Sequence, residues 1–328
     1  MDLVTELLDD LRVQSALYSR FEMRGAWAVE YPRSEMAGFH LVSHGRCVLE
    51  GHGGAPLHLG PGDLVVLPGG TGHVVRGSLP ARGTPVADLV ARSDTPGAVR
   101  VGTDGEEARF LCGGFRFAAG PEHPLLSALP AVIHVSMRDA ESHPWLTTFL
   151  SAMECESTAG RPGAEMVMSR LADILFVQAV RAHLAALPDG ARGWVGALRD
   201  PTVAAALALI HRNPEMPWTV ESLGRAVGLS RSQFAARFSQ TVGEPPVAYL
   251  AGWRTHRAKA LLREGTTRVS RIAHMLGYGS EAAFSTAFRR WTGTSPGAYR
   301  RALRAGDTED VLATAVASPG RLIVESAG

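Results

Sequence analysis

Two sets of polar side chains occupy matching places in the C-terminal third of the chain. The first follows a glycine turn and comprises Arg231, Ser232, Gln233 and Arg237. The second follows a similar turn and comprises Ser280, Glu281, Ser285, Thr286, Arg289 and Arg290. Arginine pairs well with guanine, glutamine with adenine, and hydroxyl groups with phosphate or base edges. These residue types near the start of a helix predict contacts with a nucleic-acid duplex.

The elements that position these side chains form a repeat between Leu223 and Tyr299. The first copy contains Leu223, Gly228, Phe234, Phe238, Gly243, Pro246 and Tyr249; its counterparts are Ile272, Gly277, Phe284, Phe288, Gly293, Pro296 and Tyr299. Each copy has the pattern of a helix, a tight turn, a second helix and a helix that starts at proline. Two helix-turn-helix units in phase are typical of proteins that read DNA.

Local signals predict where these helices begin. Thr219 and Ser230 are expected to cap the two helices of the first unit, and Ser270 and Ser280 those of the second. In the last of these helices, Trp291 is expected to be buried together with the two phenylalanines.

A proline-started helix from Pro246 to about Arg263 joins the two units. Its ~18 residues would span about 27 Å, which compares with about 34 Å between successive major grooves. We therefore expect each recognition helix to enter one of two adjacent grooves. Four residues of the joining helix are candidates to meet phosphate: Arg254, His256, Arg257 and Lys259.

The two copies are similar without being equivalent. The turn from Gly277 to Ser280 has one residue more than the turn from Gly228 to Ser230. The second helix of each unit, the recognition or reading helix, begins at Arg231 in the first unit and at Glu281 in the second. The exposed faces of these two reading helices also differ in charge. We therefore expect an asymmetric half-site, with the first unit contributing more of the base specificity.

Charge is distributed unevenly along the 328 residues. Residues 210–306 contain fifteen Arg or Lys and five Asp or Glu, an excess of ten positive charges. The rest of the chain contains eighteen basic and twenty-seven acidic residues, although the whole is near neutral at +1. A helical bundle that does not bind DNA is the alternative for this segment. A basic module attached to an acidic one favours DNA binding.

Composition places the chain among soluble proteins of two domains, with 45% hydrophobic and 20% charged residues. No run of apolar residues is long enough to span a bilayer. The acidic, amphipathic N-terminus is unlike a signal peptide, and three widely spaced cysteines do not make a disulfide framework. We therefore expect a cytoplasmic protein with no membrane contact.

The predicted fold is a multidomain α+β architecture. Residues 1–20 carry a leucine stripe and are predicted to form one helix, whereas residues 21–117 have the short apolar runs of a small β-barrel or sandwich. The predicted domains are a sensor and dimerisation domain at 1–187 with a helical hairpin at about 143–187, a linker at 188–204, an all-α domain with two helix-turn-helix units at 205–304, and a tail at 305–328.

Residues 210–304 resemble the DNA-binding domain of AraC/XylS-type bacterial transcription regulators. The stretch RIAHMLGYGSEAAFSTAFRRWTGTSPGAYRR is very similar to the signature of that family. The resemblance implies a transcription regulator, usually an activator, that binds promoter DNA and acts with RNA polymerase. It also implies an N-terminal domain that senses a signal and often forms a homodimer.

The N-terminal region resembles the cupin-type sensor found in a subgroup of these regulators. GDLVVLPGGTGH, from Gly62 to His73, is similar to the second cupin motif, and FLCGGFRF and HPLLSALPAVIHV resemble the subgroup. His40 and His73 are the candidate effector-pocket residues. The first cupin motif departs from its usual pattern because it has no His-x-His pair. We therefore predict no metal and no cofactor, while a metal sensor that uses a third ligand and a plain core histidine stay open as alternatives.

Cys47 and Cys112 are the candidate redox residues. Small buried strand residues are the commoner fate of free cysteine. The functional alternative is a thiolate that an oxidant converts to sulfenate or disulfide; some members of the subgroup respond to oxidants.

Together these patterns predict a sequence-specific DNA-binding regulator that is not an enzyme and that senses a small effector or an oxidant. The alternative function is a cupin-type metal-dependent enzyme with an accessory nucleic-acid-binding module.

Overall fold

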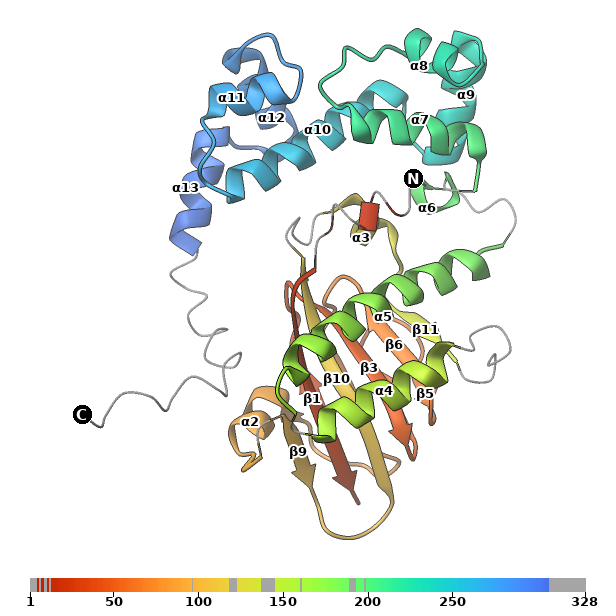
Figure 1. Ribbon diagram of the computed structural model, residues 1–328, viewed down its shortest axis with the longest axis vertical. Coiled ribbons are helices and arrows are strands. Elements are labelled where there is room, and N and C mark those ends of the chain that lie inside the picture. Colours follow the sequence, from red (N-terminus) through yellow and green to blue (C-terminus); the bar gives the residue numbers. More distant parts are fainter. Residues whose placement is uncertain are drawn as a thin grey trace, which may run out of the picture. The chain divides into compact units, whose positions relative to one another are not determined.

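The computed structural model describes most of the chain in two compact units (Figure 1). The described residues are 5, 7–8, 11, 13–95, 97–117, 123–136, 145–159, 161–188, 193–197 and 199–306. The barrel unit contains residues 13–117 and 129–186, and the helical unit is built mainly from residues 187–306. Residues 123–128, which lie between two strands of the barrel in sequence, belong to the helical unit. The predicted tail lies outside the described residues beyond Gly306.

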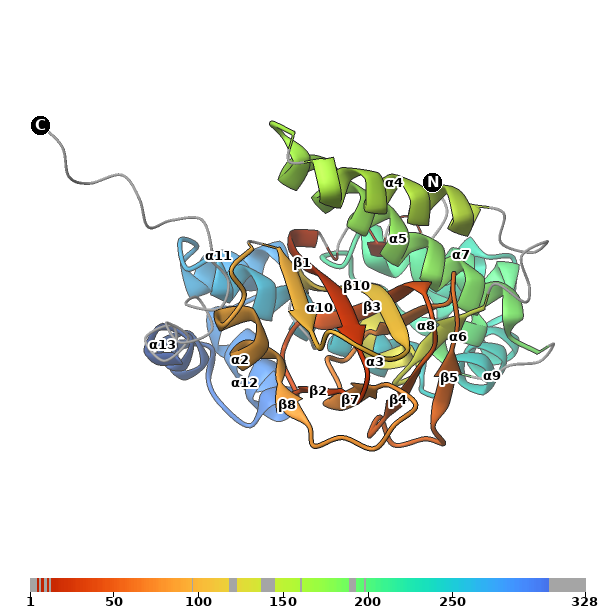
Figure 2. The same ribbon diagram turned by 90° about the horizontal axis from the view of Figure 1, so that it is seen from below.

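Two sheets face each other in the barrel unit (Figure 2). The larger has the strand order β11-β6-β3-β10-β1-β9 and the smaller the order β5-β4-β7-β2-β8. The strands are β1 (Val13–Arg24), β2 (Ala28–Tyr31), β3 (Ala37–His44), β4 (Cys47–Glu50), β5 (Leu57–Leu59), β6 (Leu64–Leu67), β7 (His73–Arg76), β8 (Thr84–Pro85), β9 (Ala98–Val101), β10 (Glu107–Phe117) and β11 (Ile133–Val135). This arrangement confirms the predicted cupin-like barrel.

Alternation along β1 and β10 builds the core between the sheets. Phe21 and Phe110 are partners in the antiparallel register, and their rings stack at 5.1 Å. Trp27 also stacks on Phe110, at 5.7 Å. Each of these side chains is nearly inaccessible to water. Burial of each contributes roughly 1.5–3 kcal/mol, which holds the two sheets together.

The N-terminal helix prediction is wrong in its extent. Residues 5, 7, 8 and 11 are helical, but β1 begins at Val13. β1 pairs with β10 over nearly its whole length and with β9 on its other edge. These partners lie about 80 residues or more away in sequence, and their hydrogen bonds outweigh the helical spacing of the leucines.

Helices α4 (Trp145–Ala159) and α5 (Ala164–Ala186) form the predicted hairpin. They lie over the outer face of the larger sheet (Figure 1), where Phe176 of α5 packs against Phe115 and Phe117 of β10. A short helix, α2 (Val86–Ala91), follows β8. Within the described residues, no helix combines the length and the apolar character needed to cross a bilayer.

The helical unit contains the tandem repeat. Its helices are α3 (Pro124–Ala128), α6 (Trp194–Ala197), α7 (Pro201–Arg212), α8 (Val220–Ala226), α9 (Arg231–Val242), α10 (Pro246–Arg263), α11 (Val269–Met275), α12 (Glu281–Thr292) and α13 (Pro296–Gly306). The predicted linker at 188–204 therefore contains α6 and the start of α7. The long helix α10 connects α8 and α9 at one end to α11 and α12 at the other (Figure 1).

Candidate DNA-binding surface and barrel core

Local capping positions the first reading helix. The Thr219 side chain accepts from the Ser222 amide at the start of α8, and the Ser230 side chain accepts from the Gln233 amide at the start of α9. Both caps are therefore confirmed. Phe234 and Phe238 are fully buried, so the opposite face of α9 is turned to solvent.

Three of the four polar candidates on α9 already have intramolecular partners, and for Ser232 the partner is the Ser230 hydroxyl at 3.5 Å. The Gln233 side-chain oxygen accepts from the Ser230 amide at 3.2 Å and from the Ser230 hydroxyl at 2.8 Å, which completes a capping box. Arg237 donates through Nε to Asp200 Oδ2 at 2.7 Å. Arg231 and Ser232 remain exposed at the helix start. Of the four candidates, Arg231 alone makes no side-chain hydrogen bond or ion pair with a described residue.

The second reading helix is built in the same way. Ser280 caps α12 by accepting from the Ala283 amide, and Phe284 and Phe288 are buried. The turn before α12 is close-packed: Gly277 has φ +75°, and a Cβ there would collide with the Glu215 carbonyl oxygen. Glycine is therefore required at this turn both for its backbone conformation and for space.

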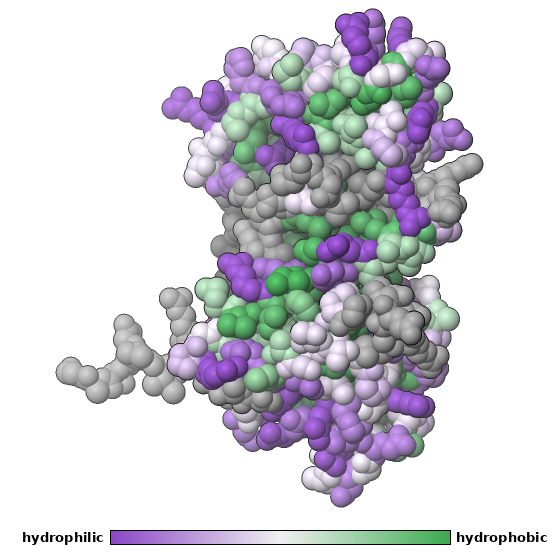
Figure 3. Space-filling view, turned by 45° about the vertical axis from the view of Figure 1, so that its right-hand side comes forward, coloured by the Kyte–Doolittle hydropathy of each residue, from purple (hydrophilic) through white to green (hydrophobic). Residues whose placement is uncertain are grey.

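The polar candidates on α12 are mostly unengaged. Thr286 donates its hydroxyl to the Ala282 carbonyl at 3.0 Å, a bond within the helix. Among the residues that the structure describes, Glu281, Ser285, Arg289 and Arg290 make no side-chain hydrogen bond or ion pair, and all except the half-buried Ser285 are exposed. Figure 3 shows strongly hydrophilic side chains projecting from the helical unit. The polar side chains of α12 therefore have fewer intramolecular partners than those of α9.

Two of the residues predicted to meet phosphate from α10 already have partners inside the helical unit. Arg254 donates to the Pro214 carbonyl at 2.6 Å and the Met216 carbonyl at 2.9 Å, and burial lowers its pKa. His256 is 6% exposed and stacks against Trp253. The contacts of both residues come from loops and rings that helical periodicity does not reveal. Arg257 and Lys259 stay as predictions.

Two further expectations in this unit are wrong. The cap of α11 is Arg268, which makes no side-chain capping bond, because the helix begins at Val269 and places Ser270 inside its first turn. Trp291 is 47% exposed and therefore not part of the buried core. Its ring lies beside Gly252 of α10, where an added Cβ would be 3.3 Å from the ring.

The barrel core brings the two candidate histidines into direct contact. His40 on β3 and His73 on β7 lie with their Nε2 atoms 2.7 Å apart, and His73 Nδ1 is 2.7 Å from the Thr71 carbonyl. Because a carbonyl only accepts, His73 donates from Nδ1, and in the neutral pair His40 donates from Nε2. Burial, then the neighbouring His73, holds the pKa of His40 well below its usual range, and burial lowers that of His73.

Tyr31 links the histidines to the two candidate cysteines. Its ring stacks on His73 at 4.8 Å and meets the edge of His40 at 4.8 Å. Burial, followed by the nearby Cys112 and Cys47 thiols, raises the pKa of Tyr31. Burial raises the pKa of both Cys47 and Cys112 to about 12. Both thiols are therefore protonated at neutral pH, and the thiolate needed for rapid oxidation is scarce.

No group of three or more His, Cys, Asp or Glu side chains within the described part of the chain has an arrangement that would hold a metal ion.

Comparison with known proteins follows the same division of the chain. Residues 2–185 match the cupin family and residues 223–302 match a helix-turn-helix domain. An AraC-like transcription regulator of Streptomyces antibioticus is 36% identical over 304 residues, which cover 92% of this chain and 99% of that protein. The chain belongs to the AraC-like family of DNA-binding transcription regulators.

Other members of the family are also similar to this regulator. AlkR of Acinetobacter baylyi is 32% identical over 308 residues, covering 92% of the regulator and 99% of AlkR. Among solved structures, the DNA-binding domain of AdpA in complex with a target DNA is 32% identical over 32% of the regulator and 94% of that chain, with a TM-score of 0.30.

Sequence patterns missed two residues of this regulator that engage the candidates. Asp200 caps α7 by accepting from the Thr202 and Val203 amides, and its second oxygen holds Arg237. A helix cap before Pro201 was recognisable, but the bond to Arg237 was not. Tyr31 carries no sequence signal, since one tyrosine in a strand is ordinary.

Proposed function

We propose that this regulator recognises an operator sequence through both α9 and α12 and acts as a transcription activator. The observation that carries the proposal is the pair of serine-capped helices and the polar side chains on their solvent-facing sides. These are Arg231 and Ser232 at the start of α9, Glu281 at the start of α12, the half-buried Ser285, and Arg289 in the last turn of α12. These side chains have the chemistry of base and phosphate contacts. Ser280 and Arg290 flank the second set, and Arg237, Gln233 and Thr286 are supporting residues.

The test combines operator selection with charge-matched variants. The full-length protein selects duplexes from a random pool, and anisotropy then measures affinity for the selected and scrambled duplexes over a range of salt concentrations. We expect a selected motif, a steep salt dependence, and a loss of preference in Arg231→Ala and Arg289→Ala. Arg92→Ala, an exposed arginine of the barrel unit, is the control. A pool without a motif would contradict the proposal.

We infer further that an effector or oxidant acts through the barrel in the cytoplasm, with no catalytic turnover. The cluster of His40, His73, Cys47 and Cys112 around Tyr31 supports a sensing role for the core. DNA affinity measured with reductant and with mild oxidant, in wild type and Cys112→Ser, tests the redox branch. Because both thiols have a raised pKa, we expect slow oxidation. An unchanged affinity in all four samples would leave a small-molecule effector as the signal.

A homodimer and contact with RNA polymerase complete the proposal. Helix α5 exposes Met166, Val167 and Ile174, with 63%, 45% and 44% of their surfaces accessible, and exposed apolar side chains on one helix favour association. Native mass spectrometry of Ile174→Glu should show monomer where wild type shows dimer. Ser151→Glu, on the exposed part of α4, is the control. Transcription in vitro with purified polymerase tests activation.

A further inference from the structure

A cleft of about 370 Å³ opens at one end of the barrel unit. Its lining includes turns at Gly25, Gly45 and Gly77 and the first residues of β10. Trp27, which lines it, precedes β2, whereas Tyr31 at the other end of β2 pairs with His73. The cleft is therefore at the opposite end of β2 from the histidine pair. Its volume is in the range of sites for small organic ligands.

Backbone hydrogen bonds and glycines keep this cleft open. The Gly77 amide donates to the Trp27 carbonyl at 3.1 Å, and the Gly25 amide donates to the Glu106 carbonyl at 3.1 Å. A Cβ at Gly77 would lie 2.9 Å from Trp27 Nε1. A side chain at position 77 would therefore push into the space beside the indole, so the cavity depends on glycine there.

One aromatic side chain, Trp27, lines the cleft. Trp27 is 3% exposed, so only a small part of its side chain is accessible. Its ring stacks on Phe110, which also stacks on Phe21. Because the Trp27 ring is packed in the barrel core, the part of it that lines the cleft is preorganised for contact with an apolar group.

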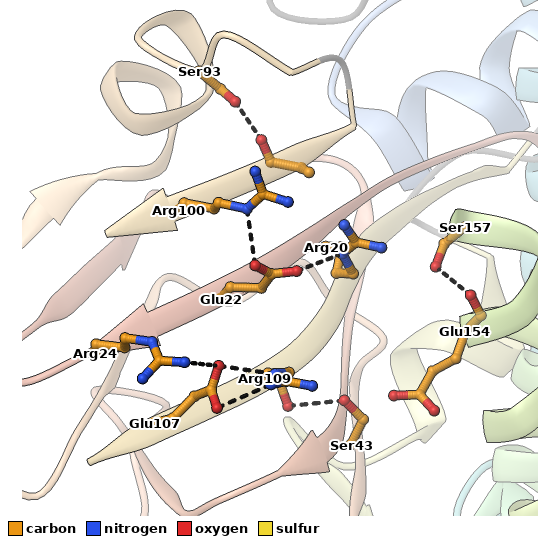
Figure 4. Close-up of polar contacts among 11 residues, drawn as sticks. Arg20, Glu22, Arg24, Ser43, Ser93, Arg100, Glu107, Arg109, Glu154 and Ser157 are labelled. Carbon is orange, nitrogen blue, oxygen red and sulfur yellow. Dashed lines mark hydrogen bonds and ion pairs between the residues drawn. The ribbon is translucent and has the colours of Figure 1, made fainter. Parts of the chain in front are cut away.

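The charges of the cleft divide into engaged and available groups. Glu107 is held by Arg24 at 3.0 Å and by Arg109 at 2.9 Å, as Figure 4 shows, and the hydrogen bond from Arg109 leads the lowering of its pKa. Glu106 accepts a single hydrogen bond, from the Ser78 hydroxyl at 2.8 Å. Arg46 is exposed and makes no ion pair with any described residue. One cation and one anion are therefore left for a ligand.

We propose that this cleft binds a small zwitterion with an apolar side group, the chemistry of an amino acid. Glu106 receives the ammonium group, Arg46 pairs with the carboxylate, and the apolar group lies against the accessible part of Trp27. Arginine suits a carboxylate because its planar guanidinium donates two parallel hydrogen bonds. The proposal rests on the effector-sensing role inferred above and gives the effector a chemical class and a site distinct from His40 and His73.

Three matched probes test this assignment by fluorine NMR on the full-length protein without DNA. 4-Fluoro-L-phenylalanine carries both charges, 3-(4-fluorophenyl)propanoate lacks the ammonium, and 4-fluorophenethylamine lacks the carboxylate. We expect the zwitterion to bind about tenfold more tightly than either truncated probe, because each loses one charged hydrogen-bonding contact.

Charge-removing variants then assign each contact. Arg46→Gln should weaken the zwitterion and the propanoate and spare the amine, whereas Glu106→Gln should weaken the zwitterion and the amine and spare the propanoate. Arg33→Gln and Glu35→Gln, two exposed residues outside the cleft lining, are the matched controls and should change nothing. All four substitutions are at exposed side chains, and circular dichroism checks that each variant is folded.

The proposal is overturned if the three probes bind equally, if none binds at millimolar concentration, or if the cleft variants behave like the controls. DNA affinity for the selected operator, measured on the same samples, separates this result from the proposed function. Probe binding without operator binding contradicts the regulator's proposed function alone. Operator binding without probe binding contradicts the cleft alone.

Discussion

The two helix-turn-helix units of this regulator have matching cores and different polar surfaces. Phe234 and Phe238 pack at 5.5 Å in the first unit, and Phe284 and Phe288 pack at 5.7 Å in the second. Both reading helices begin with a serine cap and end at a left-handed glycine. Buried geometry is therefore repeated closely, which keeps both helices in the form needed to enter a groove.

The surfaces of the two units differ in how their polar side chains are used. In α9, Gln233 forms part of the capping box, and Arg237 donates a hydrogen bond to Asp200. In α12, Ser285 and Arg289 make no side-chain bond to a described residue. The sequence favoured the first unit as the main source of base specificity, whereas these bonds favour the second. A repeat thus conserves a scaffold without conserving the role of each exposed position.

The turn glycines give the largest expected difference between the units. Gly228→Ala should cost about 1–2 kcal/mol, because the residue has a positive φ but open space around it. Gly277→Ala should cost about 2–5 kcal/mol, because the new methyl also meets the Glu215 carbonyl. Hydrogen exchange of the α9 and α12 amides measures each cost locally. Equal costs would show that the two turns are equivalent.

Truncating the exposed arginines compares the reading surfaces directly. Arg231→Ala and Arg289→Ala should each weaken operator binding by about 1–3 kcal/mol if the side chain reads a base. We expect Arg289→Ala to relax sequence preference more than Arg231→Ala does. Anisotropy with single-base operator variants measures the preference. A greater loss of sequence preference in Arg231→Ala would show that the first unit contributes more of the base specificity.

Substitutions at Gln233 and Ser285 distinguish a residue that stabilises its helix from one that contacts DNA. Gln233→Ala should destabilise α9 by about 0.5–1 kcal/mol through loss of the capping box. Ser285→Ala should leave stability within about 0.5 kcal/mol and change operator affinity instead. Denaturant unfolding and anisotropy on the same two variants provide both readings. If Gln233→Ala alters base preference at an unchanged stability, the capping role is not its main one.

The bond between Asp200 and Arg237 predicts a small pH effect confined to the first unit. Burial acts to raise the pKa of Asp200, but the bond from Arg237 and two backbone amides lower it overall. Its stabilising contribution is therefore complete above the ordinary aspartate pKa of about 3.9 and is lost as pH falls through the lowered value.

Hydrogen exchange of α9 in acid should detect this loss, and Arg237→Gln should reduce it. Glu221→Gln, which removes the exposed pair with Arg225 on α8, is the control. An identical acid response in wild type and Arg237→Gln would show that the Asp200–Arg237 bond does not cause the loss of stability.

Patterns that depend on neighbouring residues were predictable from the sequence. The repeat, the caps at Thr219, Ser230 and Ser280, and the joining helix all follow from short-range spacing. The glycine-punctuated barrel and the helical hairpin were also recognisable. Failures occurred where distant strands compete with local spacing, as in β1, which pairs with β10 where a helix was expected.

The barrel unit shows the same limit at the level of single side chains. Sequence motifs named His40, His73, Cys47 and Cys112, and the structure brings all four to one cluster around Tyr31. The spacing of the histidines along the chain did not reveal that their Nε2 atoms lie 2.7 Å apart. That contact requires β3 and β7, which belong to different sheets, to face each other across the core.

The sequence by itself determined the two-domain plan and the tandem reading helices, because apolar periodicity, caps and turn glycines act within a few residues. The tertiary structure alone decided which polar side chains remain available. Asp200 reaches Arg237 across 37 residues, and the Pro214 carbonyl reaches Arg254 across 40. Such partners are set by how the helices pack, so an arginine that the sequence predicts as a DNA contact is also held by a bond within the folded unit.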